Sequence, residues 1–181
     1  APLSEIGGKG LFIKELEHAM LSDRADIAVH SVKDLPAELP ANFILPVVAF
    51  RADHRDVLVS PFGSLDDLPL GAYVGSSSLR RQAQLLSYRP DLRMAPIRGN
   101  VGSRLGKLDR GDYDAIVLAA AGIQRLGLSR SDVHPIAIET CLPAPGQGAL
   151  GVECAANSPA LEFLQPLIDF DLDRCIRAER G

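Results

Sequence analysis

The sequence predicts a two-lobe α/β protein with parallel or mixed sheets and flanking helices. Short apolar runs alternate along the chain with stretches whose apolar residues recur at helical spacing, which is the pattern of strands joined by helices. Residues 114–121 form an almost continuous apolar run, as is typical of a buried parallel strand. Polar or Pro/Gly-rich breaks at 51–56 and 141–148 favour a division into two lobes.

The chain before residue 60 is predicted to form one helix and three strands. Leu16, Ala19 and Met20 share one face of a helix from about Leu11 to Ser22. Two prolines after the first strand make the segment that follows it a loop. The predicted strands are residues 26–30, 44–50 and 57–59.

The middle of the chain repeats a pattern of strand, polar loop and helix, in which the apolar residues of both helices recur at positions i, i+4 and i+7. The two copies are strand 73–74, loop 75–78 and helix 79–86, then strand 95–97, loop 98–100 and helix 101–108. After the apolar run and the Pro/Gly-rich break, the last predicted elements are a strand at 149–154 and a helix at 161–168.

The two breaks predict that the chain leaves one lobe, builds a second and returns, so that the lobes enclose a hinged cleft. The predicted divisions are residues 1–50 with 149–168 as domain 1, residues 54–143 as domain 2, and residues 169–181 as a stub leading to a further domain.

The composition is that of an ordinary soluble α/β protein. The chain has 181 residues, 46% of them hydrophobic and 23% charged, which excludes disorder and a coiled coil. No apolar run approaches the roughly 18 residues of a membrane span, and the N-terminal residues lack the features of a signal peptide. The three cysteines and four scattered histidines match neither a disulfide framework nor a zinc site, so no metal is expected. A reducing cytoplasm fits this cysteine usage.

Positive charge is concentrated in the middle of an acidic chain. The segment Leu79–Arg110 has eight basic residues and two acids, a net charge of +6, so the remaining residues carry −10 of the total charge of −4. A nucleic-acid-binding domain is usually basic overall and places aromatic residues among its cations, whereas this segment has one aromatic residue, Tyr88. The pattern therefore favours a small anionic ligand and no nucleic acid.

Each copy of the repeated pattern places small polar residues before a helix, where backbone N–H groups and the helix dipole favour an anion. The candidate ligand-binding side chains in these loops and first turns are Ser76, Ser78, Arg80, Arg81, Arg98 and Arg104. The alternative is plain helix capping by serine and asparagine. The tandem arginines weigh against that alternative, because a cation at a helix start opposes the dipole unless an anion is bound.

Two further sites attract attention. Residues 7–10 (GGKG) lack the spacing of a phosphate-binding P-loop. We therefore interpret this segment as a mobile loop with one lysine, Lys9, that contributes to ligand binding. Lys33 and Asp34 follow a predicted strand, where α/β sheets place their ligands. A lone aspartate there is often a turn or cap residue. An aspartate in a cleft lined with arginines would instead stay ionised and stabilise a cationic centre.

Several long segments together resemble the porphobilinogen deaminase (hydroxymethylbilane synthase) family. They are Ile6–Phe12 (IGGKGLF), Ala25–Pro36 (ADIAVHSVKDLP), Gly75–Gln82 (GSSSLRRQ), Ile97–Leu105 (IRGNVGSRL) and Pro143–Ala149 (PAPGQGA). The segments occur in the family's order and span nearly the whole chain.

The resemblance implies an enzyme of tetrapyrrole (heme) biosynthesis that joins four porphobilinogens head to tail, with loss of ammonia, on a covalent dipyrromethane primer. It implies a fold like that of the type-2 periplasmic binding proteins, with the active site between two domains. It also implies that Asp34 is the catalytic residue. The residues implied to bind substrate or cofactor are Lys33, Ser31, Ser76, Ser78, Arg80, Arg81, Arg98, Arg104, Arg125, Gln147 and Lys9.

The chain departs from the family pattern in three ways. Glu5 stands where many members have a basic residue, the first strand–helix–strand of domain 1 is missing, and so is the third domain with the primer cysteine. None of Cys141, Cys154 and Cys175 lies in the cofactor-attachment motif. We therefore expect a fragment that is inactive alone and prone to self-association, whereas the full-length protein is a monomer that binds no membrane.

Two other functions compete with this interpretation. A non-catalytic two-lobe module that binds a solute or senses an effector would explain the fold and the anion-binding loops, but not Lys33 and Asp34 beside so many arginines. A phosphoribosyltransferase-like enzyme would need an acidic pair near a phosphate loop, and none is found.

Overall fold

The computed structural model describes residues 8–181, with side chains from Phe12 onward, and divides into two compact units. The first unit consists of Ala1–Arg51 and Pro145–Gly181, and the second of Ala52–Ala144. Each unit has its own sheet and its own hydrophobic core. No helix in the described part of the chain is long and apolar enough to span a membrane.

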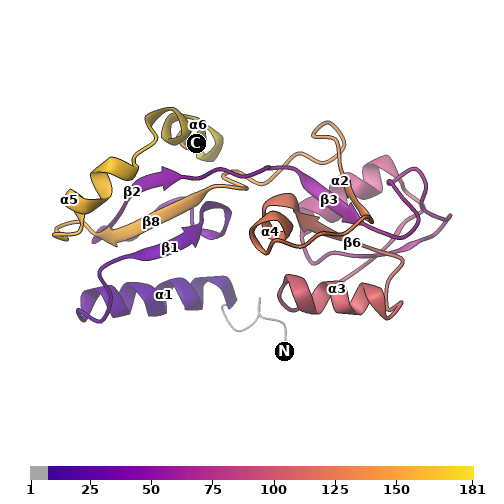
Figure 1. Cartoon of the computed structure of the whole chain (residues 1–181), viewed down its shortest axis with the longest axis horizontal. Coiled ribbons are helices and arrows are strands. Elements are labelled where there is room, and N and C mark those ends of the chain that lie inside the picture. The colour runs from indigo at the N-terminus through magenta and orange to yellow at the C-terminus, as the bar shows by residue number, and fades with distance from the viewer. Residues whose placement is uncertain (1–7) are drawn as a thin grey trace. The chain divides into compact units, whose positions relative to one another are not determined.

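The first unit is built around a three-stranded sheet in the order β1-β8-β2, in which both outer strands run antiparallel to β8. Figure 1 shows α1 alongside β1 and α6 alongside β2. The elements are α1 (Gly8–Leu21), β1 (Ala28–Ser31), the 3-10 turn η1 (Val32–Asp34), β2 (Phe43–Ala49), β8 (Leu150–Ala155), α5 (Leu161–Leu164), the 3-10 turn η2 (Gln165–Leu167) and α6 (Phe170–Arg180).

The strand β2 contains a proline, Pro46, at an irregularity in its pairing with β8. The register shifts between Ile44 and Val47, so Pro46 lies where the ladder is interrupted. Because proline has no N–H to donate, this interruption lets it occupy the interior of a strand. The residues beyond it pair regularly up to Ala49, which places the end of β2 beside the start of β8.

Residues 169–181, which we expected to lead to a further domain, belong to the first unit, and Phe170–Arg180 form α6. Asp169 caps this helix by accepting a hydrogen bond from the N–H of Leu172 at 3.0 Å. Leu172 and Ile176 lie one turn apart on the same face, and Ile176 packs fully buried against Val32 and Val48. The predicted helix at 161–168 is also shorter than expected, because the α-helical turns end at Leu164.

The second unit has a five-stranded mixed sheet in the order β5-β4-β6-β3-β7. The strands β5, β4 and β6 are parallel, whereas β3 runs antiparallel to both of its neighbours. The elements are β3 (Asp56–Val59), β4 (Tyr73–Gly75), α2 (Leu79–Tyr88), β5 (Arg93–Ala95), α3 (Val101–Asp109), β6 (Ala115–Ala119), α4 (Ala120–Arg125) and β7 (Val133–Pro135).

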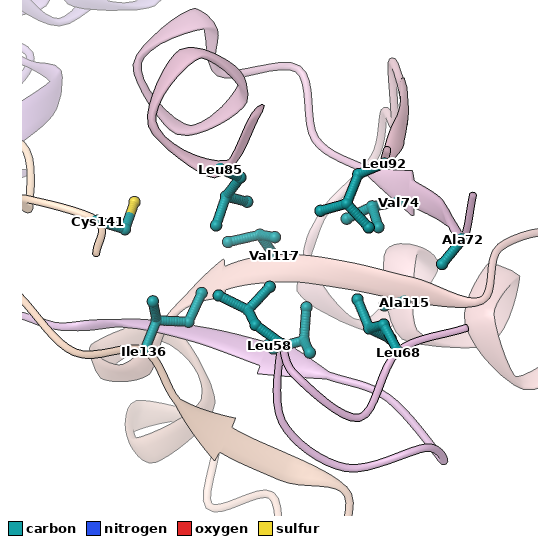
Figure 2. Packing of buried hydrophobic residues seen from close by; sticks show 11 residues of the cluster. Leu58, Leu68, Ala72, Val74, Leu85, Leu92, Ala115, Val117, Ile136 and Cys141 are labelled. Carbon is teal, nitrogen blue, oxygen red and sulfur yellow. The ribbon is translucent and has the colours of Figure 1, made fainter. Parts of the chain in front are cut away.

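Alternating side chains of this sheet form two separate cores. In the first, Leu58 and Val117 pack with Leu85 of α2, which points toward them in Figure 2. In the second, residues one position along the same strands pack with Leu105 of α3 and Ile123 of α4. The two clusters follow from the period of two along a strand, which sends successive side chains to opposite faces.

Sequence patterns missed two elements of this unit. The apolar run expected to be a strand up to residue 121 leaves the sheet after Ala119 and continues directly as α4. The short strand β7 was not predicted. The predicted α/β class with parallel and mixed sheets is nevertheless confirmed.

A buried carboxyl group in the first unit lacks part of its hydrogen bonding. Glu153 of β8 has no exposed surface, and its Oε2 lies 2.7 Å from Nε2 of His30 in β1. Its Oε1 has no hydrogen-bond partner in the described part of the chain. Burial raises the pKa of Glu153, contact with His30 opposes this, and the charge of Glu17 in α1 adds to it. The net direction is upward, so the folded protein holds this proton more tightly than the unfolded chain does.

We expect Glu153→Gln to stabilise the protein at alkaline pH. A raised folded-state pKa contributes stability below the unfolded pKa, and this stability is lost as the pH rises through the folded pKa. The glutamine amide does not ionise, so the variant does not lose stability as the pH rises. Its free energy of unfolding at pH 8, measured in urea, should therefore be higher by about 1–2 kcal/mol and should vary less with pH. The exposed Glu162→Gln is the control. A Glu153→Gln protein less stable than the wild type at pH 8 would contradict this.

Candidate functional site

The predicted catalytic residue lies where the backbone leaves the sheet of the first unit. The strand β1 ends at Ser31 and passes directly into the turn η1, which contains Lys33 and Asp34. Val32 has no exposed surface, and its N–H donates to the carbonyl of Ala149 at 3.1 Å. Because Val32 is fixed in the core, Lys33 and Asp34 are held half-buried beside it rather than on a free loop.

The returning chain supplies a partner for Lys33. Gln147, which is 1% exposed, accepts a hydrogen bond at its Oε1 from Nζ of Lys33 at 3.3 Å. The neighbouring Gly146 has a φ of +71°, and a Cβ built on it would lie 2.6 Å from Cγ1 of Val32. Only glycine combines this backbone conformation with such a close approach, so Gly146 is needed to bring Gln147 against the turn.

The end of α6 ties these segments together. Glu179 forms a bidentate ion pair with Arg51, at 2.6 and 3.0 Å, and accepts a hydrogen bond from the N–H of Gly146 at 2.8 Å. Arg51 also donates to the carbonyl of Gln147 at 3.3 Å. Arg51 and Gly146 stand where the chain leaves and re-enters the first unit, so one glutamate fixes both crossings.

In the second unit, the serines of the first loop are hydrogen-bonded to the protein itself. Ser78 caps α2 by accepting from the N–H of Arg81 at 3.4 Å, and Ser76 is 1% exposed, with its N–H donating to the carbonyl of Ala95 at 2.8 Å. Asn100 caps α3 in the same way, accepting from the N–H of Ser103 at 2.8 Å. Both helix starts thus have the caps that the capping alternative requires.

The tandem arginines bind a carboxylate that the sequence did not single out. The oxygens of Asp56 accept from Nη2 of Arg80 at 2.8 Å and from Nη2 of Arg81 at 2.6 Å. Asp56 has no exposed surface and lies 24 and 25 residues before its partners. The only signal in the sequence was a polar residue directly before a short apolar strand.

Positive charge is concentrated at the start of α3. Arg104 donates from Nε to the carbonyl of Gly99 at 2.8 Å and has no acidic partner among residues 12–181. Burial lowers the pKa of Arg104, and the charge of Arg81 lowers it further. Lys107 donates to the carbonyl of Arg98, which is exposed at the same helix start. A half-buried cation that is repelled by a neighbouring cation is a good place for an anionic ligand.

The remaining candidates are more dispersed. Arg125 is exposed in the last turn of α4. The side chain of Lys9 lies outside the described residues. Arg89 and Arg110, two further arginines of the basic segment, form ion pairs with Asp91 and Asp112.

The cysteines and the acidic residues suggest no metal site. Cys141 and Cys154 are buried, and burial raises the pKa of Cys141 to about 11. Cys175 is exposed on α6. Within the described part of the chain, no group of three metal-ligating side chains is close enough to hold an ion.

The fold, with a sheet and flanking helices in each of two units, is that of the type-2 periplasmic binding proteins. The structure of the probable amino-acid ABC transporter extracellular-binding protein ytmK from Bacillus subtilis superposes with a TM-score of 0.51, at 14% identity, over 92% of this chain and 74% of that chain. A TRAP periplasmic solute binding protein from Desulfovibrio salexigens gives a TM-score of 0.48 at 14% identity, over 91% and 57%. At these identities the likeness concerns the fold alone.

The family is given by the sequence. The family model described as "Porphobilinogen deaminase, dipyromethane cofactor binding domain" matches residues 1–162. The chain therefore belongs to the porphobilinogen deaminase family, and the resemblance inferred from its motifs is confirmed. The family is one of transferases in tetrapyrrole biosynthesis that bind a dipyrromethane cofactor.

Proposed function

We propose that the natural protein containing this sequence is a hydroxymethylbilane synthase, which condenses four porphobilinogens head to tail and releases one ammonia for each. The observation that carries the proposal is the half-buried pair Lys33 and Asp34, fixed at the end of β1 in a chain of this family. Asp34 lies on a rigid turn beside Lys33, whose ammonium group is hydrogen-bonded to Gln147. A carboxylate held in this way can stabilise a cation without moving.

Asp34 would act on the pyrrole ring of the substrate. Its carboxylate would accept hydrogen bonds from the ring N–H groups and stabilise the positive charge that develops as the C–N bond breaks and ammonia leaves with the electron pair. The same carboxylate would stabilise the cation formed when the next ring attacks this carbon, before that ring loses its proton.

The cations of the second unit would bind the carboxylates of the substrate. Each porphobilinogen has an acetate and a propionate, so a growing chain accumulates negative charge. Arginine suits these groups because its planar fork binds a carboxylate through two hydrogen bonds. We assign this role first to Arg98 and Arg104, since Arg104 has no acidic partner in the described residues.

The donor set also fits the dipyrromethane cofactor that the family implies. That group carries four carboxylates and two pyrrole N–H groups, and this chain offers guanidinium groups near the start of α3 and an aspartate at η1. When bound, the cofactor supplies the ring to which the first porphobilinogen is joined. We assign its attachment to none of the cysteines in this chain; Cys141 and Cys154 are buried.

The direct test is the intact mass of the natural full-length protein, measured under denaturing conditions before and after incubation with porphobilinogen. A covalent adduct of two porphobilinogen-derived rings, followed by release of a linear tetrapyrrole, is the expected result. An unmodified mass that persists after incubation would overturn the proposal. It would favour the competing function, a non-catalytic anion-binding module.

A further inference from the structure

The two arginines at the start of α2 have different surroundings, although they are adjacent in sequence. Arg81 is buried, and its guanidinium is occupied by protein acceptors: Nε and Nη2 donate to Oδ1 of Asp56 at 3.1 and 2.6 Å, and Nη1 donates to the carbonyl of Val117 at 3.1 Å. It therefore connects α2 to β3 and β6 in the interior of the second unit.

Arg80 is held through its two terminal nitrogens and is more exposed than Arg81. Its side chain is 26% exposed, against 9% for Arg81. Its Nη2 donates to Oδ2 of Asp56 at 2.8 Å, and its Nη1 donates to the carbonyl of Leu142. Its Nε has no acceptor among the described residues. A guanidinium held in this way has a fixed orientation and keeps donor capacity for a ligand.

Asp56 is the residue that both arginines share. Its Oδ2 also accepts a hydrogen bond from the thiol of Cys141 at 3.4 Å. Cys141 lies at the edge of the core shown in Figure 2. The group of Asp56, Arg80 and Arg81 has two positive charges and one negative charge, so one positive charge remains. This charge stands at a helix start and near Arg104, where an additional cation is unfavourable unless it is compensated.

We propose that Asp56 is a positioning residue that gives the tandem arginines different roles. It holds Arg81 in the interior, where Arg81 acts as a brace that connects α2 to the sheet, and it orients Arg80 toward a carboxylate of the substrate. The inference rests on the proposed function for the identity of the ligand. It departs from the expectation that both arginines bind substrate, since Arg81 has its donors engaged inside the unit.

The test compares Arg80→Lys, Arg81→Lys and Asp56→Asn in the full-length protein, with Arg110→Lys, in an exposed ion pair with Asp112, as the control. For each we would measure KM and kcat for porphobilinogen and the thermal unfolding midpoint. Arg80→Lys should raise KM about tenfold and leave the midpoint within about 2 °C, because its lost contact is with the ligand. Arg81→Lys should lower the midpoint by roughly 5–10 °C, with a smaller rise in KM, because a buried pair is broken.

Asp56→Asn should show both effects, and combining it with Arg80→Lys should raise KM no further than the larger of the two single effects. If Asp56→Asn fails to fold, the KM values and unfolding midpoints of Arg80→Lys and Arg81→Lys still test the proposal. A larger KM effect for Arg81→Lys than for Arg80→Lys, or an additive double variant, would overturn the proposal. Absence of turnover in the wild-type protein would count against the proposed function, and the unfolding midpoints would still test Arg81 as the brace.

Discussion

Replacing Asp34 with asparagine should lower kcat for hydroxymethylbilane formation in the full-length protein by at least about a thousandfold. The amide is nearly the same size as the carboxylate and keeps one acceptor oxygen, so it fits the same turn. It carries no negative charge, however, and so it cannot stabilise the cation that forms when ammonia leaves. The loss should fall mainly on kcat rather than on KM, because the charge matters most in the transition state.

The fold should remain intact in this variant. The turn η1 is fixed by the burial of Val32 and by its hydrogen bond to Ala149, neither of which involves the Asp34 side chain. The unfolding midpoint should therefore stay within about 2 °C of the wild type. Asp26→Asn, at an exposed position before β1, is the matched control and should leave kcat unchanged. An Asp34→Asn enzyme with near-normal turnover would refute the assigned role.

The second large effect is expected at Glu179. Glu179→Gln removes one charge from a bidentate ion pair with Arg51 and weakens the acceptor for the N–H of Gly146. Hydrogen bonds to charged groups contribute about 1.5–3 kcal/mol, so unfolding in urea should show a loss of about 2 kcal/mol. The exposed Glu162→Gln should change stability by less than about 0.5 kcal/mol.

A second variant separates the ion pair from the backbone contact. Arg51→Gln removes the pair but leaves Glu179 free to accept from Gly146, so it should cost less than Glu179→Gln. The double variant should cost no more than Glu179→Gln alone, because both changes act on one network. Additive losses would show that the two residues act independently, contrary to the observed contacts.

Several features of the fold could be predicted from the sequence because they depend on local patterns. The strands around Val57 and Val74 and the helices after Ser78 and Asn100 follow from apolar spacing and capping residues. The helix α4 could not be predicted, because its first residues continue the apolar run of β6 and hydropathy does not mark where a strand ends. The helix α6 was missed because only Leu172 and Ile176 form its apolar face, too few to stand out.

The candidate site shows the same limit. The motif residues around Asp34 and Arg104 were recognisable as short, contiguous segments. Asp56 was not, because its importance depends on partners more than twenty residues away that come close only in the folded sheet. Glu179 is more distant still, 128 residues from Arg51. Pairings of this kind are properties of the tertiary structure, and no local pattern announces them.

The order of strands in the first unit has a consequence for how the chain folds. Its central strand, β8, follows the entire second unit in the sequence, and both β1 and β2 pair with β8. During synthesis, β2 (Phe43–Ala49) therefore leaves the ribosome about a hundred residues before β8 (Leu150–Ala155), and β1 leaves it earlier still. The second unit is continuous in sequence, so it can fold as soon as it is synthesised. The sheet of the first unit cannot form until β8 is made, and until then β1 and β2 have no strand to pair with in that sheet. The turn that holds Asp34 is thus among the last parts of the molecule to form.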